Sequence, residues 1–332
     1  MVYIYKKIIG LKTYYYLRAS SRQGTKTLTQ DIAYLGSTLE EVHHALERLP
    51  QYTKEIRKAY KTIHHFLESN HYKEKALDLK LKKDHYLSHT LIDIEACKIH
   101  YNTVFAKQPT LTKQEIYKNF VIEFAFNTTS IEGNTIKLHE ARNLLQQDLT
   151  PKNKTIREVY DIHNTQRTFF HLLETSQPLT HDLIIQIHKM LMDRIDPRIG
   201  YRTTDVRVIK SNFTATPAPY VLTDMKLLLQ WYQQYESKLH PLVLASLFHH
   251  KFEHIHPFMD GNGRTGRMLL NYILLSKNYP PLVIHTKTRK QYLNALRSAD
   301  KHSLLDISPE QYSPLAQFIA QEMIESYWNI FL

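Results

Sequence analysis

The first part of the chain alternates apolar and polar side chains with a period of two, which is typical of β-strands. Three such runs, at residues 2–9, 13–19 and 26–34, are rich in Tyr, Ile, Val and Thr. The turn-forming segments GLK and RQG separate the runs, and DIAYLGS closes the series at Gly36. The pattern therefore predicts a small β module at the start of the chain.

From Ser37 onward apolar residues recur every three or four positions, which is the spacing of amphipathic helices. Ser37 with Glu40, and Thr112 with Glu115, have the spacing of a capping box and predict two helix starts. The helices expected from the whole pattern span about residues 38–48, 52–69, 85–106, 113–127, 137–147, 155–175, 180–194, 223–238, 241–255, 263–278, 288–299 and 309–328.

Two segments interrupt the helical pattern. Residues 201–221, YRTTDVRVIKSNFTATPAPYV, alternate in the manner of a β-hairpin. In NYPPLVIH, Pro280 and Pro281 end a helix because proline lacks the backbone N–H that a helix needs. The prediction is a mainly α-helical protein with a β module in front and one hairpin inside.

Composition narrows the class of protein. With 332 residues and 42% apolar side chains, the chain can bury a large core and is not a disordered protein. One cysteine, Cys97, excludes an internal disulfide framework and fits a reducing compartment. No stretch reaches the roughly 18 apolar residues of a membrane span, and the first 20 residues lack the apolar core of a signal peptide. We expect a soluble cytoplasmic protein without a membrane partner.

The net charge of +11 admits anionic partners, including nucleic acid. The charge is mostly dispersed, however, and the densest run, Lys73–His85, is broken by acids and leucines. That run is typical of a solvated helix face. Nucleic acid therefore stays an open alternative rather than an indicated partner.

Glycine is scarce, yet three of the eight glycines lie within six residues of HPFMDGNGRTGR, residues 256–267. The segment spells G-x-G-x-x-G, which binds dinucleotides only after a strand and with an acid about 20 residues further on. The preceding HPLVLASLFHHKFEHI has a helical period, and no acid occurs between Asp260 and Asp300. A phosphate-binding P-loop fails as well, since Arg267 and Met268 replace its Lys and Ser/Thr.

A second pattern, H-x-x-E-H, spans His250, Glu253 and His254 and resembles an inverted zinc-peptidase motif. In a chain with 20 histidines such a match arises easily by chance. We therefore expect His249, His250 and His254 to lie on the helix surface or to pack in the core.

Helix physics gives the glycine-rich loop a different meaning. One helix ends near His256 and another begins directly after the glycines, so free N–H groups and the positive end of a helix dipole meet there. Arg264 and Arg267 share a face of the second helix, and their guanidinium groups suit phosphate oxygens. Asp260 can hold a divalent cation beside phosphates, and the imidazole of His256 can accept a proton near neutral pH. This combination indicates phosphoryl or nucleotidyl transfer.

The same segment resembles the signature of Fic proteins, H-x-F-x-[D/E]-G-N-G-R-x-x-R, and the similarity extends over roughly residues 90–330. The matching positions are His256, Phe258, Asp260, Gly261, Asn262, Gly263, Arg264 and Arg267. The resemblance implies a Fic-type helical bundle with an internal β-hairpin flap. It divides the chain into a β module (1–36), a helical N-terminal region (37–106) and a Fic domain (107–332).

The resemblance implies transfer of AMP from ATP to a Ser, Thr or Tyr hydroxyl of a target protein. His256 would be the general base, Asp260 would bind Mg²⁺, and Phe258 would anchor the loop. The α-phosphate would be held by Asn262 and by the backbone around Gly261 and Gly263. The β- and γ-phosphates would be held by Arg264 and Arg267.

A second motif, TTSIEGN, resembles the family's inhibitory motif [S/T]-x-x-x-E-[G/N] at Thr128, Glu132 and Gly133. The resemblance implies that Glu132 pairs with Arg267 and so forces ATP into an unproductive pose. Gly133 is also a plausible C-cap for the helix that carries the glutamate. The chain would then restrain its own activity.

Two further segments resemble binding elements of the family. GYRTTDVRVI resembles the start of the flap that positions the target, with Val208, Ile209, Lys210 and Ser211 as its contacts. RKQYLNALRSAD resembles the segment over the nucleotide base, with Tyr292 and Asp300 at the relevant places.

Other functions stay open. Some members of this group transfer UMP or another phosphate-containing group, and some remove AMP. A nucleic-acid adaptor acting through the basic N-terminal region is a further alternative, although no helix-turn-helix or stacked-aromatic motif supports it. The expected partners are ATP, an unidentified target protein and, since such proteins often dimerise, a second copy of the chain.

Overall fold

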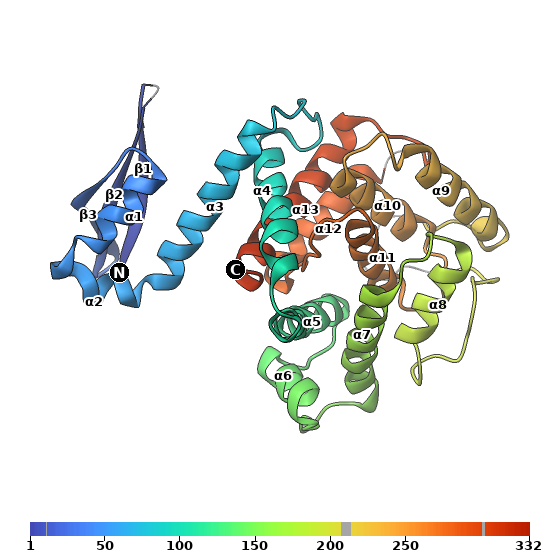
Figure 1. Cartoon of the computed structure of the whole chain (residues 1–332). Helices are drawn as coiled ribbons and strands as arrows, with labels where there is room; N and C mark the ends of the chain where they lie inside the picture. Colours follow the sequence, from blue (N-terminus) through green and yellow to red (C-terminus); the bar gives the residue numbers. More distant parts are fainter. Residues whose placement is uncertain (11, 207–213, 301–302) are drawn as a thin grey trace. The chain divides into compact units, whose positions relative to one another are not determined.

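The computed structural model describes residues 1–10, 12–206, 214–300 and 303–332. The chain forms two compact units, residues 1–81 and residues 82–331 (Figure 1). The helices up to Asp78 pack with the β module, whereas the next helix packs with the end of the chain. The domain boundaries at residues 36 and 106, which the resemblance implies, stay predictions.

The first unit is built on a three-stranded antiparallel sheet in the order β1 (Val2–Ile9), β2 (Lys12–Gln23) and β3 (Lys26–Gly36). One face carries buried apolar side chains, among them Ile4, Leu17 and Leu35. The three predicted strands are confirmed. Strand β2 continues past residue 19 to the tip of its hairpin with β3, where alternation is lost because both faces are exposed.

Three helices cover the apolar face: α1 (Leu39–Glu47), α2 (Thr53–Lys58) and α3 (Tyr60–Asp78). Ile63 and Leu67 of α3 pack in the same core as the strands. The helix cap lies one residue later than predicted, because Thr38 accepts a hydrogen bond from the backbone N–H of Glu41 at 3.2 Å. The Glu41 carboxylate accepts from the backbone N–H of Ser37, the residue before this cap.

The second unit is helical. Its α-helices in the described residues are α4 (Leu91–Thr103), α5 (Thr110–Glu132), α6 (Leu138–Gln147), α7 (Ile156–Glu174), α8 (His181–Leu191), α9 (Val221–Tyr235), α10 (Pro241–Ile255), α11 (Asn262–Ser276), α12 (Arg289–Ala299) and α13 (Pro309–Ile330). Helix α11 lies in the middle of this unit and contacts α5, α7, α8 and α10 (Figure 1). Nearly all its side chains are buried, as its uniformly apolar sequence indicates.

Further local predictions differ from the structure. The helix expected over residues 52–69 is divided into α2 and α3, and the helix expected over 85–106 begins at Leu91. Helix α5 begins at Thr110 after Pro109, so Thr112 lies inside the helix and caps nothing. The described residues 201–206 and 214–217 on either side of the predicted flap contain no strand, and residues 218–220 form a 3₁₀ turn. The predicted flap contacts Val208, Ile209, Lys210 and Ser211 lie outside the described residues.

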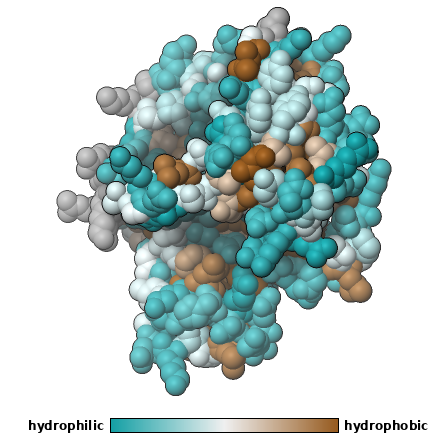
Figure 2. Space-filling model, turned by 90° about the vertical axis from the view of Figure 1, so that its left-hand side faces the viewer, coloured by the Kyte–Doolittle hydropathy of each residue, from teal (hydrophilic) through white to brown (hydrophobic). Residues whose placement is uncertain are grey.

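On the face drawn in Figure 2 hydrophilic side chains predominate, and hydrophobic ones form small separate patches. Within the described part of the chain, no helix combines the length and the apolar character that crossing a bilayer requires.

Candidate active site

The glycine-rich loop is a rigid turn between α10 and α11. His256 ends α10 in a left-handed conformation with φ of 54°, and Gly261 precedes α11 with φ of 75°. Phe258 is fully buried, and its ring stacks on His188 with the ring centroids 3.6 Å apart. The loop is therefore anchored by packing as well as by its backbone, as expected for Phe258.

Asn262 braces the loop through its side chain. Its side-chain oxygen accepts from the backbone N–H of Phe258, and its amide donates to the carbonyl of Phe258, both at 2.8 Å. The amide has a second N–H, and Asn262 lines the pocket, so its part in holding the α-phosphate stays a prediction. The backbone N–H groups in the first turn of α11 are further donors for an anion.

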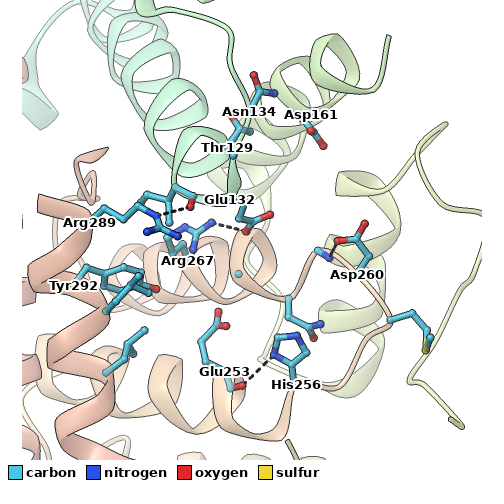
Figure 3. A pocket seen from close by; sticks show the side chains of 18 of the residues that line it. Thr129, Glu132, Asn134, Asp161, Glu253, His256, Asp260, Arg267, Arg289 and Tyr292 are labelled. Atoms are coloured by element: carbon cyan, nitrogen blue, oxygen red, sulfur yellow. Dashed lines mark hydrogen bonds and ion pairs between the residues drawn. The ribbon is translucent and has the colours of Figure 1, made fainter. Parts of the chain in front are cut away.

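His256 is poised as a base at the mouth of the loop. Its Nδ1 lies 3.3 Å from the carbonyl of Glu253, and a carbonyl can only accept, so Nδ1 carries the proton and Nε2 the lone pair (Figure 3). Burial lowers the pKa of His256, and the positive charge of Arg202 lowers it further. The imidazole is therefore neutral at neutral pH, which is the form a general base needs.

Arg202 stabilises the loop through hydrogen bonds to its backbone. Its guanidinium donates to the carbonyl of His256 at 2.8 Å, and its backbone N–H donates to the carbonyl of Pro257 at 2.8 Å. The same side chain bonds the carbonyls of Thr204 and Thr216, on the two sides of the predicted flap. Arg202 was not predicted as a site residue because its partners are distant in sequence.

Glu132 binds both signature arginines. Its Oε1 accepts from Arg267 at 2.7 Å (Figure 3). Its Oε2 accepts from Arg264 at 2.8 Å. The predicted pair of Glu132 with Arg267 is therefore present, and the contact with Arg264 is additional. A Cβ at Gly263 would collide with the Glu132 carboxylate, so the lack of a side chain there allows this approach to the helix end.

The end of α5 is fixed in the geometry that presents Glu132. Gly133 caps the helix with φ of 111°, as predicted, and its N–H bonds the carbonyl of Ser130. Thr128 accepts from Arg267 through Oγ1 at 2.7 Å and through its carbonyl at 2.9 Å. Burial opposes the charge of Arg267, but Glu132 and other nearby groups hold the pKa of its guanidinium above the usual range.

Two charged residues of α7 belong to the site and were missed from the sequence. Asp161 forms an ion pair with Arg264, whose side chain is only 3% exposed. Arg157 forms an ion pair with Asp260. Burial raises the pKa of Asp161 in spite of Arg264, and it opposes ionisation of Asp260, whose pKa is nevertheless lowered by Arg157 and Arg264.

Glu132, Asp161, His256, Asp260 and Arg267 line a pocket of about 860 Å³. Tyr292 and Asp300, predicted to lie near the base, both line it. The hydroxyl of Tyr292 lies 2.6 Å from Nε2 of His249, and Asp300 lies 3.1 Å from Nε2 of His250. Arg289, a further lining residue, donates to the carbonyl of Ile131.

The donor set fits magnesium better than zinc. In the described residues no three His, Cys, Asp or Glu side chains converge on a metal position, although H-x-x-E-H spans α10. Glu253 also lines the pocket, but its carboxylate is buried against α11, and burial raises its pKa to about 7. Asp260 is 35% exposed at the pocket, and one carboxylate together with phosphate oxygens and water is a donor set that Mg²⁺ accepts.

Comparison with known proteins shows what this site is similar to. Residues 178–274 match the family model described as Fic/DOC family. This part of the chain is therefore similar to Fic/DOC domains. The matched segment holds α8, α9, α10, most of α11 and the whole signature loop.

Curated relatives extend the similarity beyond the matched segment. The chain is 30% identical over 218 residues to "Protein adenylyltransferase Fic" of Drosophila ananassae, which covers 63% of this chain and 40% of that protein. It is 30% identical over 184 residues to "Protein adenylyltransferase fic-1" of Caenorhabditis elegans, covering 53% and 36%. The chain thus matches well under half the length of these relatives and is distantly related to them.

Solved structures share the fold of the Fic domain. A Fic domain containing signaling protein from Bacteroides thetaiotaomicron superposes with a TM-score of 0.66 at 23% identity, covering 72% of this chain and 96% of that one. Fic-1 (aa134–508) from C. elegans gives 0.60 at 23% identity, covering 87% and 76%. The mainly helical Fic-like fold is confirmed.

Proposed function

We propose that this chain is a protein adenylyltransferase that moves AMP from ATP to a hydroxyl side chain of a target protein, and that Glu132 restrains it. The observation that carries the proposal is that a neutral His256 lines one pocket together with Asp260, Arg267 and the first turn of α11. The relatives described as protein adenylyltransferases support the same reaction class.

Each residue of the pocket has a separate role in the proposed transfer of AMP. His256 takes the proton of the target hydroxyl through Nε2 while that oxygen attacks the α-phosphorus of ATP. The bond between the α-phosphorus and the bridging oxygen breaks, and pyrophosphate leaves. The N–H groups at the start of α11 stabilise the negative charge of the α-phosphate, while Arg264 and Arg267 hold the leaving phosphates.

Magnesium would be held by Asp260, and when bound it would supply positive charge beside the phosphates. Arg157 now occupies this carboxylate, so Asp260 has to exchange one positive partner for another when it takes part in the reaction.

Glu132 would restrain the reaction because its carboxylate competes with the leaving phosphates of ATP for the same two arginines. The carboxylate of Glu132 takes one donor from Arg264 and one from Arg267, which are the donors proposed for the leaving phosphates. A phosphate in that position would meet a like charge and lose its hydrogen bonds. Glu132 is therefore proposed to hold ATP away from the productive pose.

The test is self-labelling with ATP radiolabelled at the α-phosphate. Glu132→Gly should raise labelling by at least about tenfold, the effect of removing about 1.4 kcal/mol of competition. Glu115→Gly, a change at an exposed glutamate of the same helix, is the matched control and should leave labelling unchanged. His256→Ala should abolish labelling in the Glu132→Gly background.

The outcomes separate the two parts of the proposal. If Glu132→Gly labels no more than wild type while the chain still binds ATP, Glu132 is not a restraint. If His256→Ala leaves labelling intact, His256 is not the base and the reaction assignment fails.

A further inference from the structure

The outer face of the N-terminal sheet carries a row of aromatic and basic side chains. Tyr15 and Leu17 of β2 point into the core, so Tyr14, Tyr16 and Arg18 lie on the opposite face. The ring of Tyr16 lies 5.4 Å from that of Tyr34 on β3, and the Arg18 guanidinium lies 3.3 Å above the ring of Tyr5 on β1. The helices of this unit pack on the other face.

Beyond this face β2 and β3 continue as a two-stranded ribbon. Strand β1 pairs with β2 only as far as Ala19, and all residues from Ser21 to Asp31 are exposed. The pairs Arg22 with Thr27 and Gln23 with Lys26 lie next to the turn. The side chains at the ribbon end, from Ser21 to Thr27, are hydroxyls, an amide, an arginine and a lysine, without a carboxylate.

The charge of the first unit is concentrated on the sheet. Residues 1–36 contain six lysines or arginines against one aspartate, whereas residues 37–81 contain eight basic and seven acidic residues. The single aspartate, Asp31, is paired with Arg18 at 2.5 Å. The sheet is therefore a compact positive surface, although the charge of the whole chain is dispersed.

We propose that this sheet binds double-stranded DNA, with the ribbon end in the major groove and the aromatic and basic face along the phosphates. The three residue pairs beyond Ser20 extend about 10 Å, close to the groove depth of about 8.5 Å. An antiparallel two-stranded ribbon fits the groove width, and Arg, Gln, Ser and Thr are side chains that read base edges there.

The geometry of the major groove favours duplex DNA over duplex RNA as the partner of this ribbon. The major groove of duplex RNA is too deep and narrow for side chains to read, so a ribbon has no site there. Lysines of the sheet and tyrosine hydroxyls can contact phosphates on both sides of the groove. This binding surface is separate from the pocket of the Fic domain, and the proposal does not depend on the transfer reaction.

The test uses the full chain and a fluorescent mixed-sequence DNA duplex of about two helical turns. Fluorescence anisotropy should show binding that weakens steeply between about 50 and 200 mM salt. The double variant Arg22→Gln/Lys26→Gln should bind about tenfold more weakly at low salt. Its slope of log affinity against log salt should be smaller by about two, since two phosphate or base contacts are lost.

The matched control is Lys54→Gln/Lys61→Gln, which removes the same charge from exposed helical positions of the same unit. It should keep both the affinity and the salt slope, and all variants should show the same melting curve. The proposal is overturned if wild type does not bind the duplex, or if the control weakens binding equally. It is also overturned if single-stranded DNA or anionic vesicles bind more tightly than the duplex.

Discussion

At the scale of single residues, the site depends on how neighbours set the protonation of His256. Burial is the largest cause of its lowered pKa, and the positive charge of Arg202 lowers the pKa further. The hydrogen bond to the carbonyl of Glu253 acts in the opposite direction and raises it. A general base works only when deprotonated. As the pH falls, activity therefore persists below the usual histidine pKa of about 6.5 and is lost only as the pH passes through the lowered value.

We expect the acid limb of self-labelling by the Glu132→Gly variant to have its midpoint below the ordinary histidine range. The measurement is the initial labelling rate against pH, with Mg²⁺ in excess so that the charge of the nucleotide stays constant. A midpoint at or above about 6.5 would contradict the assigned environment of His256.

Arg157 offers a second test at this scale. It is paired with Asp260, and the two side chains are 54% and 35% exposed, so the pair contributes roughly 0.2–1 kcal/mol. Since Mg²⁺ and Arg157 would compete for one carboxylate, Arg157→Ala in the Glu132→Gly background should lower the Mg²⁺ concentration for half-maximal labelling. A change of up to about fivefold corresponds to this energy.

The control is Arg167→Ala, which removes an arginine of the same helix that is paired with Asp193 away from the pocket. This variant should keep the original Mg²⁺ dependence. If Arg157→Ala instead raises the Mg²⁺ requirement, Arg157 assists the phosphates and does not compete with the cation.

At the scale of elements, local periodicity was sufficient for most helices and strands. It also located α11, because its buried sequence follows directly on the glycines. The starts of helices were less predictable. Thr38 rather than Ser37 caps α1, and Pro109 precedes α5, because the choice among neighbouring polar residues depends on how the chain enters the helix.

The site residues that escaped prediction are held by long-range contacts. Asp161 and Arg157 each reach the signature loop across 103 positions, and Arg202 reaches His256 across 54. No regular spacing along the sequence indicates that residues so far apart meet in the folded chain. Asn262 shows a structural role that the motif does not reveal, since its side chain bonds the backbone of Phe258 and so braces the loop.

From the sequence, the run Tyr14–Tyr16 predicts only a β-strand. The structure separates it, with Tyr15 in the core and its two neighbours on the outer face. Adjacent strands then add Tyr5 and Tyr34 to that face. An aromatic surface built from three strands is visible only once the register is known, which is why sequence analysis did not find it.

At the scale of the whole molecule, the chain consists of two units with separate cores joined near residue 81. The segment after α3 has no regular secondary structure, and Lys80, Lys82 and Lys83 are exposed there. Proteases cut such exposed backbone far faster than backbone held in packed helices. Limited trypsin digestion of the full chain should therefore cut first after one of these lysines.

Mass spectrometry of the first products should show fragments of about 10 and 30 kDa, since residues 1–81 are about a quarter of the 39.3 kDa chain. The larger fragment contains the complete pocket, because every residue lining it follows residue 128. Earlier cleavage within α3 or α4 would contradict the division. A cut confined to Lys80–Lys83 would mean that the DNA-binding and transferase proposals concern two independently stable parts of one chain.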